Sequence, residues 1–299
     1  MSTKAHPEGA RQGPRVAVIT AGHDHHDAHM DQVAAMARAV VGPDLHVVIS
    51  MGDRDLTRGR VPLHHDRWST IVKAMPPGPR RSREMLARDA GARAALEDGA
   101  QLLIFLDPDA LPSLHLVERY ADALAEPSGE GPRVLCGGLV DPGPRPETGY
   151  DWPHLDKLVT EDLASGHHAG RLGAGGVTVE AHAELFRSAS FGISADDLES
   201  VGGIVDPDLD GDDHDLDFAS RLLGAGGSLA WLGGVAALRR PRSLDQVTAA
   251  DLDALARAAN RFEERNGREL APVPLLAAAT QAGLMRRAAS GDWALADGG

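Results

Sequence analysis

Short apolar runs alternate with helical patterns through the first half of the chain. Four runs have the length and β-branched content of buried strands: 15–20, 45–51, 101–106 and 133–140. Between the first two, apolar residues recur at helical spacing from Met30 to Val40. Helices are also predicted from Ser82 to Gly99 and from Ser113 to about Leu124, each with a serine as N-cap. This alternation predicts a mostly parallel sheet flanked by helices.

Two long segments lack this periodicity and are predicted to be loops. Residues 52–81 contain the cluster PPGP, and residues 141–190 are rich in Gly, Pro and His. A loop as long as the second one is usually functional in a compact domain. We interpret 141–190 as an acceptor loop or lid.

The C-terminal pattern predicts a helical extension. Thr248 and Asp251 have the spacing of a capping box, and Asn266-Gly267 follows as a stop signal. The apolar residues between them form one helix face: Leu252, Leu255, Ala259 and Phe262. The expected organisation is a disordered tail at 1–13, an α/β domain at 14–240, and a helical extension at 241–299 packed on that domain.

Composition limits the partners and the compartment. The 299 residues carry a net charge of −14, which argues against nucleic acid as the principal partner. Cys136 is the single cysteine, so there is no internal disulfide, and a cytoplasmic location is the simplest expectation. No apolar run approaches the roughly 20 residues of a membrane span. Peripheral membrane contact stays open.

Two acidic clusters are candidates for chemistry. Asp107 and Asp109 directly follow a predicted buried strand, where two carboxylates suit a hard divalent ion that also binds a diphosphate. Asp-Pro-Asp is equally good turn chemistry. The second cluster, GDDHDLDFASRLL at 211–223, places acid at the start of a predicted helix. Acid there is electrostatically favoured in any protein, so a well-capped surface helix is the alternative.

The order of these motifs resembles the family 2 glycosyltransferases of the GT-A fold. The resemblance covers about residues 14–240 and rests on RVAVIT, VVISMGD, ARDAGARAAL, LIFLDPDALPS and ESVGGIVDPDLDGDDHDLDFASRL. The C-terminal ANRFEERNGREL is similar to a bacterial galactosyltransferase-like subgroup. The resemblance implies an enzyme that uses a nucleoside-diphosphate sugar as donor and a saccharide, lipid-linked or small-molecule hydroxyl as acceptor.

The resemblance also assigns donor-side residues. Asp107 and Asp109 match the acidic triplet that binds Mn²⁺ or Mg²⁺ and the donor diphosphate. Arg88 matches the arginine of the family's Ala-Arg-Asn-x-Gly segment, although Asp89 replaces the asparagine. The nucleotide pocket would be lined by Thr20, Ala21, Gly22 and Asp53.

The second acidic cluster matches the family's catalytic segment, Glu-Asp-x-Asp before Arg-Leu. Counting back from Arg221 places Asp215 at the catalytic base and His214 at the glutamate; Asp213 substitutes for that glutamate if the register slips by two. The implied acceptor-side residues are Gly202, Gly203, His214 and Asp217.

The family mechanism is a direct displacement with inversion. Asp215 takes the proton of the acceptor hydroxyl as that oxygen attacks the anomeric carbon, and the metal neutralises the departing diphosphate. Many relatives add a histidine after the next strand; Leu238-Arg239-Arg240-Pro241 has none, so an arginine there is a candidate to contact phosphate. Two other classes stay open: a catalytically silent nucleotide-sugar binding module and a sugar-nucleotide nucleotidyltransferase.

Overall fold

The structure is a computed structural model of the whole chain. It describes residues 13–22, 26–57, 64–75, 80–127, 129–165, 176–205, 214–239, 244, 247–271 and 273–296. The segment 206–213, which holds Asp213, lies outside the described residues, as does nearly all of the predicted tail at 1–13.

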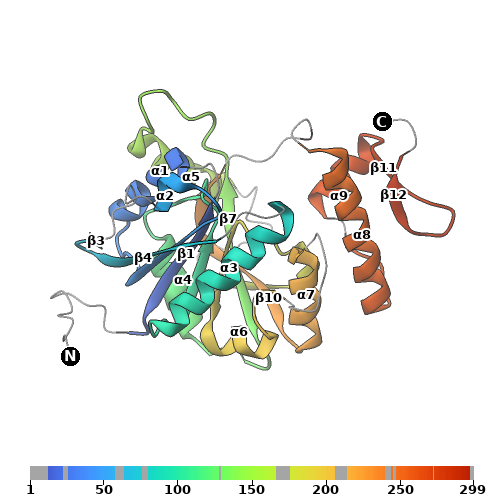
Figure 1. Cartoon of the computed structure of the whole chain (residues 1–299), viewed down its shortest axis with the longest axis horizontal. Helices are drawn as coiled ribbons and strands as arrows, with labels where there is room; N and C mark the ends of the chain where they lie inside the picture. Colours follow the sequence, from blue (N-terminus) through green and yellow to red (C-terminus); the bar gives the residue numbers. More distant parts are fainter. Residues whose placement is uncertain are drawn as a thin grey trace.

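A ten-stranded sheet forms the centre of the molecule (Figure 1). Its strands are β1 (Val16–Gly22), β2 (Leu45–Ser50), β3 (His64–His65), β4 (Trp68–Ala74), β5 (Leu102–Leu106), β6 (Leu111–Pro112), β7 (Arg133–Val140), β8 (Val177–Glu180), β9 (Ser190–Ser194) and β10 (Ser228–Leu238). Their order is β3-β4-β2-β1-β5-β9-β7-β10-β6, and β8 also pairs with β10.

The long strands run in one direction with a single exception. β4, β2, β1 and β5 are mutually parallel, and β10 is parallel to β7. β9 lies antiparallel between β5 and β7, so the strands on either side of it point the same way. Six carboxyl ends therefore collect at one edge of the sheet, which is where α/β proteins place their ligands.

Helices cover both faces of the sheet. Their bounds are α1 (His26–Arg38), α2 (Arg54–Thr57), α3 (Arg80–Glu97), α4 (Leu116–Ala125), α5 (Trp152–Ser165), η1 (Ala183–Leu185), α6 (Ala195–Val201) and α7 (His214–Gly224). β1 shows how the layers form, because its residues alternate between them: Ala17 and Ile19 pack in the core under α3, α6 and α7, whereas Val16 and Val18 pack in the core under α1 and α4.

Two segments predicted to be loops contain regular structure. Within 52–81 lie α2, β3 and β4, and β4 pairs in parallel with β2 over the full length of β2. Within 141–190 lie α5, β8 and η1. The helix of 152–165 packs Leu155 and Val159 against the end of β10. The loop predictions were therefore wrong for these elements.

The predicted helix starts also need correction. α3 begins at Arg80, so Ser82 lies in its first turn and is not its N-cap. The N-cap of α4 is His115; Ser113 contributes its backbone carbonyl, which accepts a hydrogen bond from the N–H of Leu116 at 3.1 Å.

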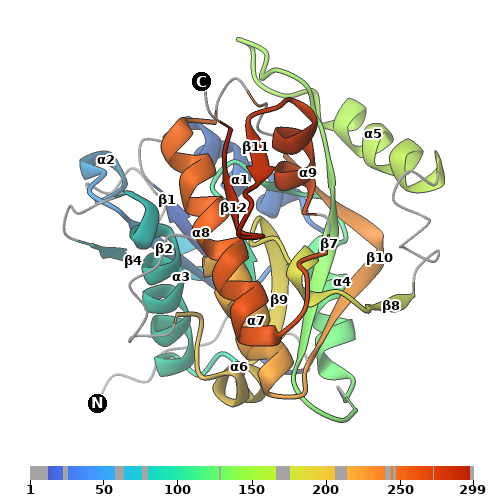
Figure 2. The same cartoon turned by 90° about the vertical axis from the view of Figure 1, so that its right-hand side faces the viewer.

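The C-terminal residues form α8 (Ala249–Asn266), α9 (Pro274–Gln281) and a hairpin of β11 (Met285–Arg287) and β12 (Trp293–Leu295). Thr248 and Asp251 make the predicted capping box, and Gly267 ends α8 in the left-handed conformation. α8 lies across α7 (Figure 2), and Leu216 of α7 joins its apolar face. This contact binds the extension to the rest of the chain.

Gly91 supplies a test of the packing between α3 and the sheet. A Cβ atom there would lie 2.4 Å from Cγ2 of Ile19 in β1, and Ile19 is fully buried. We expect Gly91→Ala to destabilise the protein by about 1–3 kcal/mol through overpacking, measured by urea unfolding. Gly224→Ala at the exposed end of α7 meets nothing within 4 Å and is the matched control. Equal stability of the two variants would contradict this packing.

Candidate active site

The Asp-Pro-Asp turn lies beyond the carboxyl end of β5 and is held from below by Gln32 of α1. The Gln32 side chain is fully buried. Its Nε2 donates to the carbonyl oxygens of Asp107 at 2.7 Å and Ala110 at 2.8 Å, and its Oε1 accepts from the hydroxyl of Thr20 at 2.8 Å. A satisfied buried amide of this kind fixes the backbone of the turn relative to β1.

The side chains of the turn belong to a cluster of two aspartates and two arginines. Arg88 of α3 donates to Oδ1 of Asp107 and, through Nη1, contacts Sδ of Met85 at 3.1 Å. Arg239, the residue after β10, lies between both aspartates: Nη2 is 2.7 Å from Oδ2 of Asp107, and Nε is 2.9 Å from Oδ1 of Asp109. Arg88 and Asp107 are buried, whereas the Asp109 side chain is 40% exposed.

The charges of this cluster stabilise one another. Burial alone lowers the pKa of the Arg239 guanidinium, but the carboxylates of Asp107 and Asp109, with Glu84 nearby, outweigh it and raise that pKa above its ordinary value. Arg239 is therefore a permanent cation beside the turn.

Asp215 reaches the same edge of the sheet from α7. Its Oδ2 accepts a hydrogen bond from the backbone N–H of Ser188 at 3.2 Å. The next residue, Ala189, accepts a hydrogen bond from the backbone N–H of Asp107 at 3.0 Å. Two successive residues ahead of β9 therefore contact the two acidic segments, so the structure brings together Asp107 and Asp215, which are far apart in the sequence.

Cys136 of β7 lies beneath Asp215. The thiol is 2% exposed, and burial raises its pKa to about 12, with Asp215 adding to the rise and Arg187 opposing it. Such a thiol is not a nucleophile at neutral pH.

Asp217, which the resemblance assigned to the acceptor side, lies between α7 and α8. Its side chain is buried and bound by two arginines, Nε of Arg221 at 3.1 Å and Nη1 of Arg265 at 2.8 Å. An aspartate four residues before Arg221 on α7 points to the same helix face, which is the face covered by α8. The role of Asp217 is to join α7 to α8.

Gly202 and Gly203 form the end of α6. Both have positive φ, 81° and 90°, which only glycine adopts without strain. Arg221 holds this turn through the carbonyl oxygens of Val201 at 3.0 Å, Gly203 at 2.7 Å and Ile204 at 2.7 Å. The helix cap accounts for the two glycines. The turn leads directly into 206–213, before His214, whose side chain is not described.

The residues predicted for the nucleotide pocket separate into two groups. The Thr20 side chain is fully buried under α1, so its hydroxyl serves the fold and does not line a pocket. Gly22 lies beside the Asp-Pro-Asp turn, because a Cβ there would be 3.5 Å from Cβ of Pro108. The same Cβ would be 3.7 Å from Cδ1 of Leu56, whose N–H donates to Oδ1 of Asp53 at 3.4 Å. Ala21 is buried in the core under α3.

The described residues fit a divalent ion poorly. Both predicted ligands, Asp107 and Asp109, are already bridged by the guanidinium of Arg239. Within the ranges that the structure describes, no three His, Cys, Asp or Glu side chains gather as a possible ligand set. A cation that bridges the two carboxylates would have to displace Arg239.

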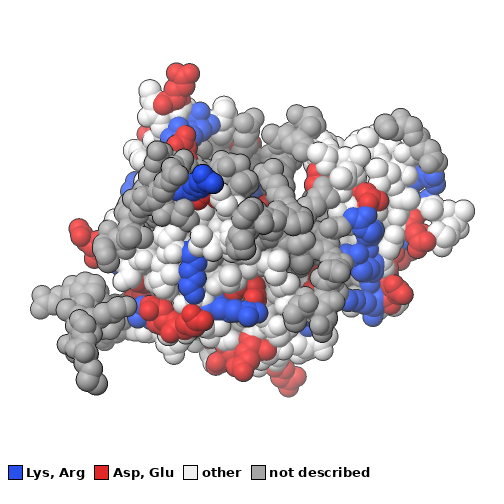
Figure 3. Space-filling view, viewed as in Figure 1, with Lys and Arg blue, Asp and Glu red and all other residues white. Residues whose placement is uncertain are grey.

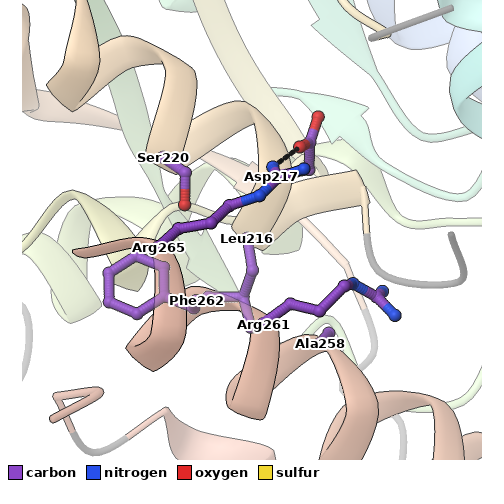
Figure 4. Close-up of a pocket in the computed structure, with 7 residues that line it drawn as sticks. All are labelled: Leu216, Asp217, Ser220, Ala258, Arg261, Phe262 and Arg265. Atoms are coloured by element: carbon purple, nitrogen blue, oxygen red, sulfur yellow. Dashed lines mark hydrogen bonds and ion pairs between the residues drawn. The ribbon is translucent and has the colours of Figure 1, made fainter. Parts of the chain in front are cut away.

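A small pocket of about 10 Å³ lies between α7 and α8 (Figure 4). It is lined by Leu216, Asp217, Ser220, Ala258, Arg261, Phe262 and Arg265. That volume is about the space of one water molecule, so the pocket is a packing gap and not a donor site. Figure 4 shows Arg265 reaching across it to Asp217.

Four positions at this site were not predicted from the sequence: Gln32, Ser188, Ala189 and Glu184. Gln32 shares a helix face with Met36, but the apolar stripe read from the sequence was that of Met30, Val33, Ala37 and Val40, so the burial of Gln32 was not visible there. Ser188 and Ala189 act through their backbones and have no sequence signal. Glu184 anchors the C-terminal extension through its ion pair with Arg268.

Similar folds occur among solved structures. S. aureus TarS 1–349, crystallised also in complex with UDP-GlcNAc, matches at 12% identity and a TM-score of 0.54 over 84% of this chain and 65% of its own. The Pyrobaculum calidifontis mannosyltransferase PcManGT, in complex with GDP-Man and Mn²⁺, matches at 17% and 0.52 over 91% of this chain and 70% of its own. GalNAc-T7 with UDP, GalNAc and Mn²⁺ matches at 15% and 0.50 over 85% of this chain and 50% of its own.

These likenesses confirm the predicted fold class, a GT-A type α/β fold with a mostly parallel sheet. The chain spans about two thirds of the TarS fragment and half of the GalNAc-T7 chain. No family model matches the sequence, and no curated protein matches it either. Among the described residues, no helix combines the length and the apolar character that crossing a bilayer requires.

Proposed function

We propose that this chain is a glycosyltransferase that transfers a sugar from a nucleoside-diphosphate donor to a hydroxyl acceptor with inversion. The observation that supports this most strongly is the Ser188-Ala189 peptide, which contacts the donor-side segment at Asp107 and the candidate base Asp215. Direct displacement needs one group that binds the donor diphosphate and a separate base for the acceptor hydroxyl. Both must lie close together at the same edge of the sheet. Membership of family 2 is part of the proposal and is supported by the motif order.

Asp215 has the surroundings of a general base. Its carboxylate lies at the start of α7 and accepts a hydrogen bond from the Ser188 N–H at 3.2 Å. An ionised carboxylate within hydrogen-bond reach of the acceptor hydroxyl can take its proton as the oxygen attacks the anomeric carbon. The leaving diphosphate departs toward the guanidinium of Arg239.

The donor's nucleoside fits beside Gly22 and Asp53. Gly22 keeps the end of β1 without a side chain, and Asp53 offers a carboxylate at the end of β2. The compartment that we propose is the cytoplasm, where a single thiol stays reduced. Mn²⁺ or Mg²⁺ was expected at Asp107 and Asp109, but the residues present fit it poorly, and the transfer proposed here takes no step through a metal.

A donor screen tests the proposal. UDP-, GDP- and dTDP-sugars are added to the protein, with EDTA and with Mn²⁺, and the melting temperature is followed. A ligand that binds only the folded state at 100 times its Kd stabilises it by about 2.7 kcal/mol. We expect one nucleotide class to raise the melting temperature and its nucleoside monophosphate to raise it less.

Turnover then separates the alternatives. Release of the nucleoside diphosphate from the stabilising donor, with water or an added hydroxyl acceptor, is expected of a transferase. Binding without turnover over a broad acceptor panel favours the silent binding module. Stabilisation by a nucleoside triphosphate but by no nucleotide sugar would favour the nucleotidyltransferase.

A further inference from the structure

Arg239 occupies the position between two carboxylates that a divalent ion would need. Its guanidinium contacts one oxygen of Asp107 at 2.7 Å and one oxygen of Asp109 at 2.9 Å. Arg88 approaches Asp107 through the carboxylate oxygen that Arg239 does not contact. Two aspartates and two arginines sum to zero net charge, the same value that one divalent ion would give the two aspartates alone.

The sheet fixes where this arginine stands. β10 pairs with β7 up to Val140 and with β6 at Leu111, two residues beyond Asp109. The backbone N–H of Arg239 itself donates to the carbonyl oxygen of Val140 at 2.8 Å. Because β10 is hydrogen-bonded on both edges, the backbone of Arg239 has a fixed position beside the Asp-Pro-Asp turn.

Displacing Arg239 by a metal is costly. The Arg239 side chain is only 18% exposed, and Asp107 is 12% exposed. An ion pair of low exposure that loses one partner leaves a poorly solvated charge behind. Arg239 and a metal ion would therefore compete for the same two carboxylates. Arg239 has the advantage that it is part of the chain, whereas the ion must bind from solution.

The guanidinium also retains capacity for a ligand. It carries five N–H donors, and the contacts with Asp107 and Asp109 require two of them. Its planar fork matches phosphate oxygens, so it can keep both aspartates and donate to a diphosphate at once. Lysine, a point charge, would do this less well.

We infer that Arg239, supported by Arg88, takes the place of the divalent cation, so that the site binds the donor diphosphate without metal. This inference rests on the proposed function. The two proposals can fail separately, because a nucleotide sugar can be the donor whether an arginine or a metal ion neutralises its diphosphate.

The test is calorimetric titration of UDP, GDP and dTDP into the full chain, in EDTA and in Mn²⁺. For the wild type we expect the Kd of the nucleotide that binds to differ by less than about 3-fold between the two conditions. Arg239→Gln removes charged hydrogen bonds to phosphate and is expected to weaken binding in EDTA by about 10- to 100-fold. It also removes the guanidinium that bridges the two carboxylates, so Mn²⁺ should restore part of that loss.

A readout without nucleotide accompanies the titration. Electron paramagnetic resonance of Mn²⁺ alone is expected to show no bound ion at this site in the wild type and a bound ion in Arg239→Gln. Arg257→Gln on α8, an exposed arginine paired with one aspartate, is the control and should behave as the wild type. Thermal unfolding of each variant without ligand establishes that the variant is folded. Arg239→Lys is a second variant, which keeps the positive charge.

The outcomes separate the two proposals. Nucleotide binding that is lost in EDTA and present in Mn²⁺ overturns the role of Arg239 and leaves the proposed function standing. Binding in EDTA that Arg239→Gln and Arg239→Lys do not change overturns it as well. Failure of every nucleotide in both conditions contradicts the proposed function itself.

Discussion

Asp215→Asn is expected to lower the turnover number of sugar transfer by about 10³-fold, within the range that a general base contributes. Asparagine keeps the shape of the side chain and can still accept a hydrogen bond from Ser188, so the fold and the donor pocket should persist. The amide cannot take the proton of the acceptor hydroxyl. The measurement is steady-state transfer with the donor found by the screen, together with the donor's Kd.

Asp196→Asn is the matched control for this variant. Asp196 is also an acid in the first helical turn, on the neighbouring α6, and it is exposed. We expect the control to retain wild-type transfer. If Asp215→Asn kept more than about a tenth of the turnover number, a loss too small for a general base, another residue would have to be the base.

Arg268→Gln is expected to destabilise the protein by about 3 kcal/mol, because it removes the arginine that pairs with the buried carboxylate of Glu184. Glu184 is fully buried and binds Arg268 with both oxygens, at 2.7 and 2.9 Å. The backbone N–H of Ala271 adds a hydrogen bond at 3.2 Å. Glu184 lies in η1, four residues before Ser188, so this pair fastens the segment after α8 to the loop that contacts Asp215. Chemical unfolding of the variant measures the loss.

The same pair predicts acid sensitivity. Burial alone would raise the pKa of Glu184, but the hydrogen bonds from Arg268 and Ala271 lower it from 4.5 to about 2. The depressed pKa means that this stabilisation is complete above about pH 5 and is lost as the pH falls toward 2. Stability measured from pH 7 to pH 3 should therefore fall more steeply in the wild type than in Glu184→Gln.

Arg257→Gln is the control for Arg268→Gln, because it removes an exposed ion pair instead of a buried one. Arg257 and Asp253 are about half exposed and lie one turn apart on α8. Removing this pair should change stability by less than about 0.5 kcal/mol. Figure 3 shows basic side chains in a row over α8. The sequence of α8 has arginines at four-residue spacing, at 257, 261 and 265. A similar loss in Arg257→Gln and Arg268→Gln would mean that Glu184 is not what fastens the extension.

The fold was predictable where the pattern is local. β1, β2, β5 and β7 are fully or mostly buried strands, and their apolar runs identify them directly. β4 is partly exposed along most of its length, so its sequence, WSTIVKA, lacks that signal, and its pairing with β2 makes it a strand. α5 did carry a readable signal in Leu155, Leu158 and Val159, which the surrounding Gly, Pro and His residues obscured.

The site was predictable as a set of acids but not as a set of contacts. The end of a buried strand singled out Asp107 and Asp109, and an acidic helix start marked 211–217, but the choice of Asp215 within that cluster came from the family resemblance. Spacing could not show that Asp217 turns toward Arg265, since that depends on where α8 packs. Nor could it show that Arg239 lies between the two aspartates, because β10 reaches them only through the sheet order β7-β10-β6.

The buried thiol of Cys136 makes the natural chain a ready background for site-directed labelling. With a pKa of about 12 and almost no exposure, it should resist maleimide reagents at neutral pH. A cysteine introduced at an exposed position, such as Val179 of β8, would then be the one reactive thiol. Fluorophores or spin labels attached there can report distances as nucleotides are added, without first removing any native residue.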